Sequence, residues 1–208
     1  MIKIPSHLKV KRKIPISEKQ LINFENKIFE SYNKSLIPYP IHLSGNNEKY
    51  LIKIFSYIQK TDYVFSNWRS HYHAILHGLS SLQVKNQIFE GKSMSITGKN
   101  FFASSIVGGC IPIALGTAYA NKFLKKNNQK VWCFIGDMTY ETGIFHESYK
   151  YSKNYDLPLT FIIEDNDFST NTPTKEAWGK KSKIPNDVIY YKYKRKYPHH
   201  GTGTWVLF

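Results

Sequence analysis

Two side chains of the kind that bind hard cations follow two short apolar runs of this 208-residue chain. Asp137 stands just after the run VWCFI (131–135), and Asn166 stands just after the run LPLTFII (157–163). Short runs rich in β-branched and aromatic residues indicate strands buried on both faces of a parallel sheet. The carboxyl ends of neighbouring parallel strands meet at one edge of the sheet, where ligands bind. We therefore expect Asp137 and Asn166 to lie close together.

The spacing of these two residues supports two interpretations. A carboxylate, an amide oxygen and a backbone carbonyl form a set of hard oxygen ligands that suits Mg²⁺ or Ca²⁺, with phosphate oxygens and water completing the coordination. Asp and Asn also cap helices and turns without any ligand. On spacing alone, capping is slightly favoured.

The elements that must position this edge alternate between strand and helix. Helical spacing over 140–153 lies between the two apolar runs and predicts a β-α-β unit. A strand and a His-His-Gly turn are expected within 188–208. We expect further helices from a cap at Ser17 to the prolines at 37–40, over 48–60, over 79–90 and within 106–126, with a loop over 91–105. The whole pattern predicts an α/β fold, with a mostly parallel sheet flanked by helices.

The length of the chain is sufficient for one compact domain. We expect residues 1–60 to hold an extended arm, over 1–16, and the N-terminal helices. Residues 61–208 are expected to form the α/β domain. No apolar run approaches the roughly 18 residues of a membrane span, and the N-terminus lacks the apolar region of a signal peptide. Cys110 and Cys133 lie in apolar surroundings, so we expect buried free thiols, a reducing compartment and a cytoplasmic location.

The strongly basic composition needs an explanation. The chain has 29 Lys and Arg against 15 Asp and Glu, a formal charge of +14. Nucleic acid is one class of partner for such a chain. However, the lysines are scattered and no nucleic-acid-binding module is present, so we do not expect nucleic-acid binding. An anionic ligand, an acidic partner subunit or an AT-rich genome explains the charge equally well.

A resemblance to a known family decides between the two interpretations of the strand ends. Gly136-Asp137 followed by Asn166, 29 residues after Asp137, resembles the thiamine-diphosphate motif. The flanks are similar to the alpha subunit of the first, decarboxylating component of 2-oxo acid dehydrogenase complexes of the pyruvate and acetoin type. The segments that carry this resemblance are NWRSHYHAILHGLS (67–80), GKSMSITGKNFFASSIVGGCIPIALGTAYA (91–120) and GIFHESYKYSKNYDLPLTFIIEDNDF (143–168). The resemblance as a whole covers about residues 61–170 with almost no gaps.

The resemblance implies thiamine diphosphate and Mg²⁺ as cofactors. It implies that Asp137, Asn166 and the backbone carbonyl of Phe168 hold the metal. It implies that His71, and with it His73, stabilises or protonates a substrate oxygen. The remaining residues that it implies at the cofactor are Trp68, Arg69, Ile106, Val107, Gly108, Gly136, Met138, Thr139, His199 and His200.

Each of these assignments has an alternative without a ligand. Arg69 could form an ordinary surface ion pair, and Val107 could belong to the core. His199 and His200 could form a plain surface turn. His71, His73 and His77 could bind zinc, but no cysteine or acidic partner stands at the required spacing, so we do not expect zinc.

The chain departs from the family in two places. Met138 replaces a glycine that would allow the backbone to approach phosphate closely. The segment TKEAWGKKSKIPNDV (174–188) stands where the resemblance implies a longer connection, and the family has a helical tail beyond it. We therefore expect either a compact relative or the loss of part of the domain.

The resemblance implies an alpha-type subunit of a decarboxylating dehydrogenase that acts on a 2-oxo acid. A beta-type subunit with a pyrimidine-binding domain would supply the activating Glu in an α2β2 assembly, and a lipoyl acyltransferase could accept the product. Two alternatives stay open. One is a split transketolase-like or acetoin-type carboligase that acts on a sugar, and the other is a degenerate, non-catalytic subunit.

Overall fold

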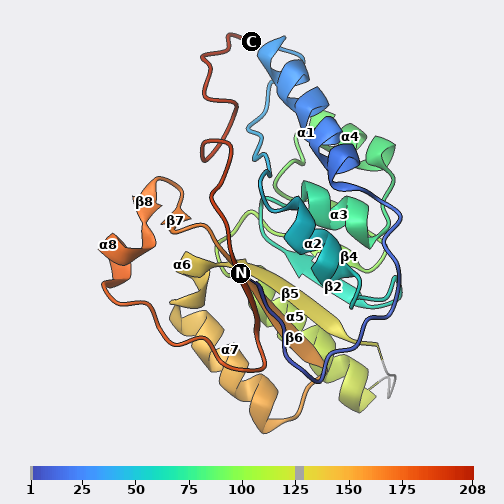
Figure 1. The fold of residues 1–208 in the computed structure, drawn as a ribbon, viewed down its shortest axis with the longest axis vertical. Helices are drawn as coiled ribbons and strands as arrows, with labels where there is room; N and C mark the ends of the chain where they lie inside the picture. Colours follow the sequence, from blue (N-terminus) through green and yellow to red (C-terminus); the bar gives the residue numbers. More distant parts are fainter. Residues whose placement is uncertain (1, 125–128) are drawn as a thin grey trace.

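A mostly parallel sheet forms the centre of the molecule (Figure 1). The computed structural model describes residues 2–124 and 129–208. Within these residues the main sheet runs in the order β1-β9-β6-β5-β2-β4-β3. The edge strands β1 (Ile2–Lys3) and β3 (Thr97–Gly98) are antiparallel to their neighbours. The five strands between them are mutually parallel: β9 (Ile189–Lys192), β6 (Leu159–Asp165), β5 (Val131–Gly136), β2 (Tyr63–Ser66) and β4 (Phe101–Ala103).

Helices contribute to a hydrophobic core on each face of this sheet. Trp132 and Phe134 of β5 join a core formed with α1 (Glu18–Asn33), α2 (Glu48–Phe55), α3 (His71–His77) and α4 (Ser81–Phe89). The alternate residues Val131, Cys133 and Ile135 join the opposite core, with α5 (Cys110–Tyr119), α6 (Asp137–Tyr140) and α7 (Gly143–Asn154). β5 is thus buried on both faces, and the predicted α/β class is confirmed.

The helix boundaries follow local chemistry. Ser17 caps α1 as predicted: its Oγ accepts a hydrogen bond from the Gln20 N–H at 3.3 Å, and the Gln20 Oε1 accepts one from the Ser17 N–H at 2.8 Å. The helix predicted over 48–60 is shorter, because α2 ends at Phe55. The helix predicted within 106–126 begins only at Cys110, since Gly108 has a φ of +73° that no regular helix contains. A π-helical turn, η1 (Ala120–Leu124), follows it.

Three of the short strands that were not expected lie in the predicted arm and loop. The arm over 1–16 contains β1, which pairs with β9 through Ile2 opposite Tyr191. The loop predicted over 91–105 contains β3 and β4. Strands of two or three residues are too short for a period of two to be visible in a sequence, so only pairing with a neighbouring strand defines them.

The segment after β6 is short and mostly irregular. It begins with a small hairpin, β7 (Phe168–Ser169) and β8 (Thr172–Pro173), and continues into α8 (Thr174–Trp178). No regular element follows until β9, the strand expected within 188–208.

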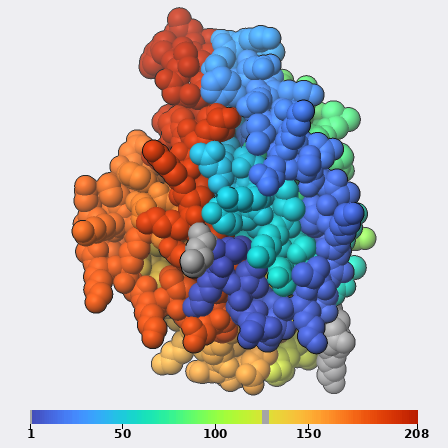
Figure 2. Space-filling view, viewed as in Figure 1, coloured from blue at the N-terminus to red at the C-terminus, as the bar shows by residue number. Residues whose placement is uncertain are grey.

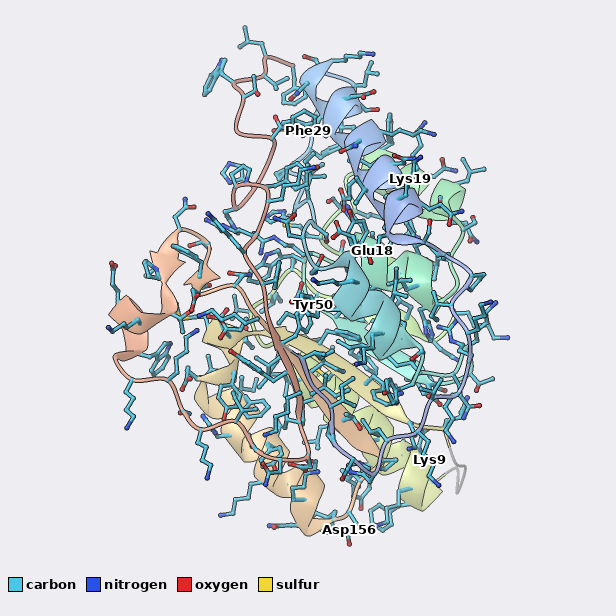
Figure 3. All side chains as sticks on the ribbon, in the orientation of Figure 1. Lys9, Glu18, Lys19, Phe29, Tyr50 and Asp156 are labelled. Carbon is cyan, nitrogen blue, oxygen red and sulfur yellow. The ribbon has the colours of Figure 1, made fainter. Side chains whose placement is uncertain are left out.

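The C-terminal residues run back along α1 and the segment after it (Figures 1 and 2). The Gly201 N–H donates to the Ile41 carbonyl at 2.8 Å, and Thr202 Oγ1 donates to Asn33 Oδ1 at 2.6 Å. Aromatic contacts join the same regions, as between Phe29 of α1 and Tyr197 at 5.8 Å. Tyr50 of α2 stacks on Tyr191 of β9 at 5.0 Å (Figure 3). These contacts bring residues 199–201 beside residues 41 and 42.

Both cysteines are buried and free, as predicted. Their Sγ atoms lie 3.7 Å apart, Cys110 on α5 and Cys133 on β5. None of the helices in the described part of the chain is both long and apolar enough to cross a membrane.

His77, at the end of α3, is a buried histidine among aromatic rings. Its ring lies 6.5 Å from that of Phe55 and 6.1 Å from that of Phe101, and 3% of the residue is exposed. Neither ring nitrogen forms a hydrogen bond with the described residues. Burial and then the charge of Arg12 lower the pKa of His77 to about 4, against a smaller opposing effect of the Asp62 backbone.

The low pKa of His77 predicts a loss of stability in acid. The unfolded chain takes up a proton near pH 6.5, whereas the folded chain resists it until about pH 4, so protonation favours unfolding as the pH falls through this window. This histidine should remove roughly 3 kcal/mol from the free energy of unfolding between pH 7 and pH 4. His77→Phe should remove that contribution, as measured by urea denaturation at both pH values. His7→Phe, at an exposed histidine, is the control, and an equal pH dependence in wild type and His77→Phe would contradict the prediction.

Candidate functional site

The ends of β5 and β6 meet at one edge of the sheet. The two strands are parallel, and Gly136 lies opposite Glu164 in their register. Asp137 begins α6 directly after β5, and Asn166 comes directly after β6. Both residues are buried, with 3% and 8% of their surfaces exposed. The β-α-β unit predicted from the sequence therefore places both residues at the same edge.

A cleft opens beside these strand ends. It encloses about 410 Å³ of empty space, including the part open to solvent. Residues that the sequence did not single out also line it, among them Asn67, Glu164, Ser169 and Tyr193. Of the residues assigned to the cofactor or metal from the sequence, the cleft brings together Trp68, Arg69, Gly136, Met138, Thr139, Asn166 and Phe168.

Arg69 is the cationic side chain in the wall of this cleft. Its backbone N–H donates to Asn67 Oδ1 at 2.8 Å, and its Nη2 donates to the His199 carbonyl at 3.2 Å. Among the described residues it forms no ion pair with a carboxylate, so a surface ion pair does not explain it. Burial lowers the pKa of Arg69 below its usual value. The guanidinium keeps donors available for an anion.

A group of ring nitrogens without partners lies beside Arg69. The ring of His42 is 4.8 Å from that of His199 and 6.3 Å from that of Trp68. His42 Nδ1, Trp68 Nε1 and His199 Nδ1 are buried and have no hydrogen-bond partner among the described residues. Burial, then His199 and then Arg69, lower the pKa of His42 to about 3. Buried polar groups are ordinarily paired, so these three indicate a place where an acceptor from a ligand can bind.

Sequence reasoning missed His42. It stands 26 residues before Trp68 in the chain and 157 before His199, and neither spacing is typical of a binding site. The hydrogen bond from Gly201 to Ile41 brings the two segments together. His200 joins the same group, with its ring 5.7 Å from that of His199 and 6.5 Å from that of His42. The turn at 199–201 is therefore part of this group and not an isolated surface turn.

His73 and His71 lie behind the cleft, not in its wall. His73 Nε2 is 3.1 Å from Glu164 Oε1, and its Nδ1 is 2.6 Å from Ser66 Oγ. His71 Nδ1 is 3.0 Å from Glu25 Oε1, and its Nε2 is 2.9 Å from Ser93 Oγ. Both residues are fully buried. No group of three or more His, Cys, Asp or Glu is arranged to hold a metal ion in the described residues.

Glu164 connects His73 to the cleft. Its carboxylate accepts hydrogen bonds from Asn67 Nδ2 at 2.9 Å and from the Tyr191 hydroxyl. Burial alone would raise the pKa of Glu164, but the charge of His73 and the hydrogen bonds from His73, Tyr191 and Asn67 hold it below its usual value. The carboxylate thus stays ionised and holds Asn67 at the cleft wall.

The loop over 106–108 lies outside the cleft lining. Ile106 is 71% exposed and Val107 is 47% exposed, so Val107 is not a core residue. Gly108 has a positive φ, and a Cβ there would come within 2.9 Å of Ile144. The same Cβ would be 3.9 Å from Thr139, so the loop passes close to the cleft and leaves its two large apolar side chains uncovered.

Asp137, Asn166 and Phe168 fit a hard cation in part. Asp137 Oδ1 is buried without a partner among the described residues, so this carboxylate oxygen is available to bind a cation. Burial is the main cause that raises the pKa of Asp137, and it is opposed by the hydrogen bond from Thr174. Asn166 Oδ1 accepts from the Phe168 N–H at 3.0 Å and keeps a second lone pair. One carboxylate, one amide and one carbonyl suit Mg²⁺, with the other positions left to water and phosphate.

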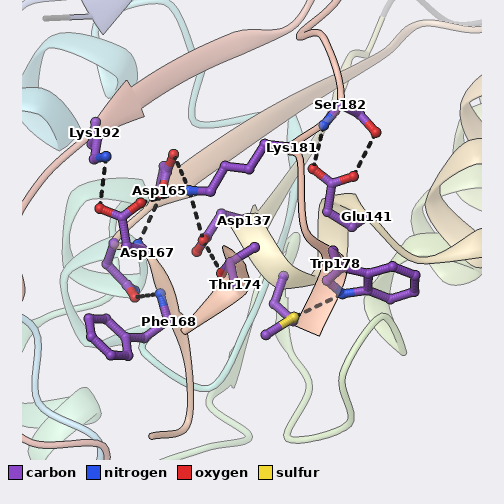
Figure 4. A network of polar contacts seen from close by, with 12 residues as sticks. Asp137, Glu141, Asp165, Asp167, Phe168, Thr174, Trp178, Lys181, Ser182 and Lys192 are labelled. Carbon is purple, nitrogen blue, oxygen red and sulfur yellow. Dashed lines mark hydrogen bonds and ion pairs between the residues drawn. The ribbon is translucent and has the colours of Figure 1, made fainter. Parts of the chain in front are cut away.

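The short segment over 174–184 lies against Asp137 and Glu141, as Figure 4 shows for Thr174 and Ser182. Thr174 Oγ1 donates to Asp137 Oδ2, and the Ser182 N–H donates to Glu141 Oε1 at 2.9 Å. Trp178 Nε1 donates to Met138 Sδ at 2.9 Å. These contacts fall on Asp137, Met138 and Glu141, which follow β5 in the chain.

Comparison with known proteins agrees with this geometry. Residues 17–187 of the chain match the dehydrogenase E1 component family. Similar curated proteins include the alpha subunit of acetoin:2,6-dichlorophenolindophenol oxidoreductase from Bacillus subtilis, which is 28% identical over 170 residues, covering 76% of this chain and 51% of the relative.

Alpha subunits of the pyruvate dehydrogenase E1 component are also similar. The one from Rickettsia bellii is 28% identical over 186 residues, covering 82% of this chain and 57% of the relative. The chloroplastic alpha-3 form from Arabidopsis thaliana is 29% identical over 161 residues, covering 69% of this chain and 38% of the relative. The chain thus spans about half the length of the curated relatives it matches.

The network around Glu164 predicts that its charge is needed for stability. Glu164→Gln keeps the shape but places amide hydrogens against donors from His73, Tyr191 and Asn67 in a buried position. We expect a loss of about 2–4 kcal/mol in the free energy of unfolding at pH 7. Glu176→Gln, at an exposed position of α8, should change it by less than about 0.5 kcal/mol. Chemical denaturation of both variants measures this, and equal stabilities would refute the role of Glu164.

Proposed function

This chain belongs to the dehydrogenase E1 component family, and from that premise we propose that it is an alpha-type subunit of a thiamine-diphosphate- and Mg²⁺-dependent, decarboxylating 2-oxo acid dehydrogenase. The observation that carries the proposal is the cleft at the ends of β5 and β6. Seven residues assigned to the cofactor or metal from the sequence alone line it.

In this proposal Arg69 and Trp68 bind the diphosphate. The Arg69 guanidinium has donors that no carboxylate occupies, and Trp68 Nε1 is a buried donor without a partner among the described residues. His199 and His200 lie beside them on the C-terminal segment. Because these donors already lie close together, little conformational entropy is lost when they bind one anion.

Asp137, Asn166 and the carbonyl of Phe168 would hold Mg²⁺ in this proposal. Asp137 contributes the free Oδ1, and Asn166 contributes its amide oxygen. Gly136 and Thr139 provide backbone groups beside the phosphates. The exposed Val107, with Ile106 and Gly108, supports the cofactor from the loop next to Thr139.

Thiamine diphosphate, when bound, supplies the carbon that attacks the substrate carbonyl and the ring that accepts the electrons. The chain's own contribution is to orient and to donate protons. His42 and His199 have unused ring nitrogens beside Arg69, and as neutral imidazoles they can donate a hydrogen bond to a ligand oxygen. His71 and His73, assigned to catalysis from the sequence, are buried with both nitrogens bonded, so we propose that they act by positioning, His73 through Glu164.

The proposal includes a second polypeptide. A beta-type subunit with a pyrimidine-binding domain would supply the activating Glu in an α2β2 assembly. The substrate would be a small 2-oxo acid, and a lipoyl acyltransferase is the expected acceptor. A cytoplasmic location stays a prediction, because matching relatives include chloroplastic and mitochondrial forms.

The outer face of α5 is the surface we assign to the beta-type subunit. Ile113 is 46% exposed and Tyr119 is 38% exposed on this helix, and Ile106 and Val107 lie exposed just before it. A Cβ at Gly116 would meet no atom within 4 Å. An apolar helix face with a bare glycine at its centre allows close approach of a second helix. The matching relatives named above are alpha subunits, which supports a beta-type partner as the occupant.

Gly116→Phe tests this surface. The isolated chain has room for the side chain, so the variant should fold, but it should lose at least about tenfold in affinity for the beta-type subunit. Gly143→Phe is the matched control, since a Cβ there also meets no atom within 4 Å. Light scattering and dilution of the co-expressed complexes measure the difference. Equal dissociation of the two variants would exclude α5 from the interface.

Calorimetry tests the proposed function itself. The chain in complex with its beta-type subunit is titrated with thiamine diphosphate in the presence of Mg²⁺ and in the presence of EDTA. We expect binding that requires Mg²⁺ and that weakens at least about tenfold in Arg69→Gln, which removes a charge-assisted contact. Lys99→Gln, another loss of one positive charge, should bind as wild type does. Absence of metal-dependent binding would refute the proposal.

One observation favours a second candidate, a non-catalytic subunit that keeps the fold for assembly. Met138 stands where the family has glycine, and a lysine from the short segment reaches Asp137. The same titration separates the two candidates, because a degenerate subunit would assemble normally and bind no cofactor.

A further inference from the structure

An ammonium group lies among the carboxylates where the proposed function places the metal ion. Lys181 Nζ is 2.8 Å and 2.9 Å from the two oxygens of Asp165, and 2.8 Å from Asp167 Oδ1 (Figure 4). The same nitrogen is 3.4 Å from Asp137 Oδ2. Within the described residues its hydrogen bonds and ion pairs are therefore all with carboxylate oxygens, and one of these belongs to the expected metal ligand.

The charges of this cluster nearly balance without a metal ion. Asp137, Asp165 and Asp167 carry three negative charges, and Lys181 and Lys192 carry two positive charges, so the sum is −1. Lys192 is 2.8 Å from Asp167 Oδ2. Without Lys181 the sum would be −2, which is the charge that a divalent cation would neutralise. Lys181 therefore contributes one positive charge, which is half of the charge that a divalent cation would contribute.

A divalent cation and the ammonium group cannot share this cluster without a cost. A cation bound to Asp137 at about 2.1 Å would lie within roughly 8 Å of Lys181 Nζ in its present position. Like charges at this separation repel each other, and solvent at the partly exposed Lys181 weakens the repulsion. Either the lysine moves or the cation binds more weakly.

The backbone around Lys181 is anchored on both sides, but the side chain has access to solvent. The segment that carries it is anchored on one side by Thr174 at Asp137 and on the other by Ser182 at Glu141. Between them Gly179 has a φ of +66°, a turn that directs the chain back toward β6. The Lys181 side chain is 31% exposed, so the ammonium can swing into water without movement of the backbone.

We propose that Lys181 is a tethered cation that occupies the acidic cluster at Asp137, Asp165 and Asp167 and competes there with the divalent cation. This inference rests on the proposed function, because it takes Asp137 as the metal ligand. Lys181 belongs to the short segment over 174–188, so the proposed competition is a property of this chain. Because of this competition, the divalent cation binds weakly until a diphosphate adds further negative charge to the site.

Mn²⁺ binding to the full chain tests the competition without any cofactor. Titration followed by the electron paramagnetic resonance signal of free Mn²⁺ gives the dissociation constant for wild type and Lys181→Met. We expect Lys181→Met to bind Mn²⁺ roughly three- to tenfold more tightly, because a partly exposed charge is removed from its vicinity. Lys181→Arg keeps the charge and should bind as wild type does. Lys183→Met, two residues away and exposed, is the neutral control and should also leave the affinity unchanged.

Thermal unfolding in EDTA gives a readout that does not involve a metal ion. Lys181→Met should unfold at a lower temperature than wild type there, since three carboxylates lose their common cation. Saturating Mn²⁺ should then raise its unfolding temperature by more than it raises that of wild type. Lys181→Gln repeats both measurements in case the methionine variant does not fold.

The outcomes separate the inference from the proposed function. Tighter Mn²⁺ binding in Lys181→Met, even with wild type too weak to measure, supports the competition. Equal or weaker binding in the variant, with measurable binding in wild type, overturns the role of Lys181 and leaves the metal site standing. If Mn²⁺ binds to neither protein, the metal site and the competition both fail.

Discussion

A buried carboxylate needs hydrogen-bond donors on every side, and Glu164 at the end of β6 obtains its donors from three separate segments. His73 of α3, Tyr191 of β9 and Asn67 after β2 all point at it. Each donor fixes the place of its own element relative to β6, so the strand ends, α3 and one wall of the cleft are positioned together. The net fall in the pKa of Glu164 shows that these donors outweigh the burial of the charge. The cleft depends on this arrangement, because Asn67 in turn holds the backbone of Arg69.

Opposite charges border the cleft on its two sides. Arg69 and the unpaired nitrogens of His42, Trp68 and His199 lie on one side, and Asp137 with its acidic neighbours lies beyond the other. A metal diphosphate presents anionic oxygens and a cation at once, so it matches such a polarised site better than a simple anion or a simple metal ion would. The same polarity explains why a lysine can lie among the carboxylates when no other cation is there.

Much of the candidate site could be predicted because it is local in the chain. Asp137 and Asn166 follow strands whose apolar character is plain, and a single helix separates them, so their meeting requires only the usual geometry of a β-α-β unit. Trp68 and Arg69 were found through resemblance and not through any period. His42 and Lys181 could not be found in this way, since each reaches the site through a segment without regular structure. The strand β1 was not predicted for a similar reason, because its two residues form a strand only by pairing with β9.

The sequence by itself determined the alternation of strands and helices, the apolar faces of β5 and the chemical types present at the strand ends, because these depend on side chains close together in the chain. The tertiary structure alone decided which of those groups share a cleft, which stay behind it and which cation lies among the carboxylates. His71 and His73 illustrate the difference, since their types suit catalysis and their burial between Glu25, Ser93, Ser66 and Glu164 makes them supports. The physical reason is that hydrogen bonding and burial are properties of neighbours in space, and most of those neighbours are far away in the sequence.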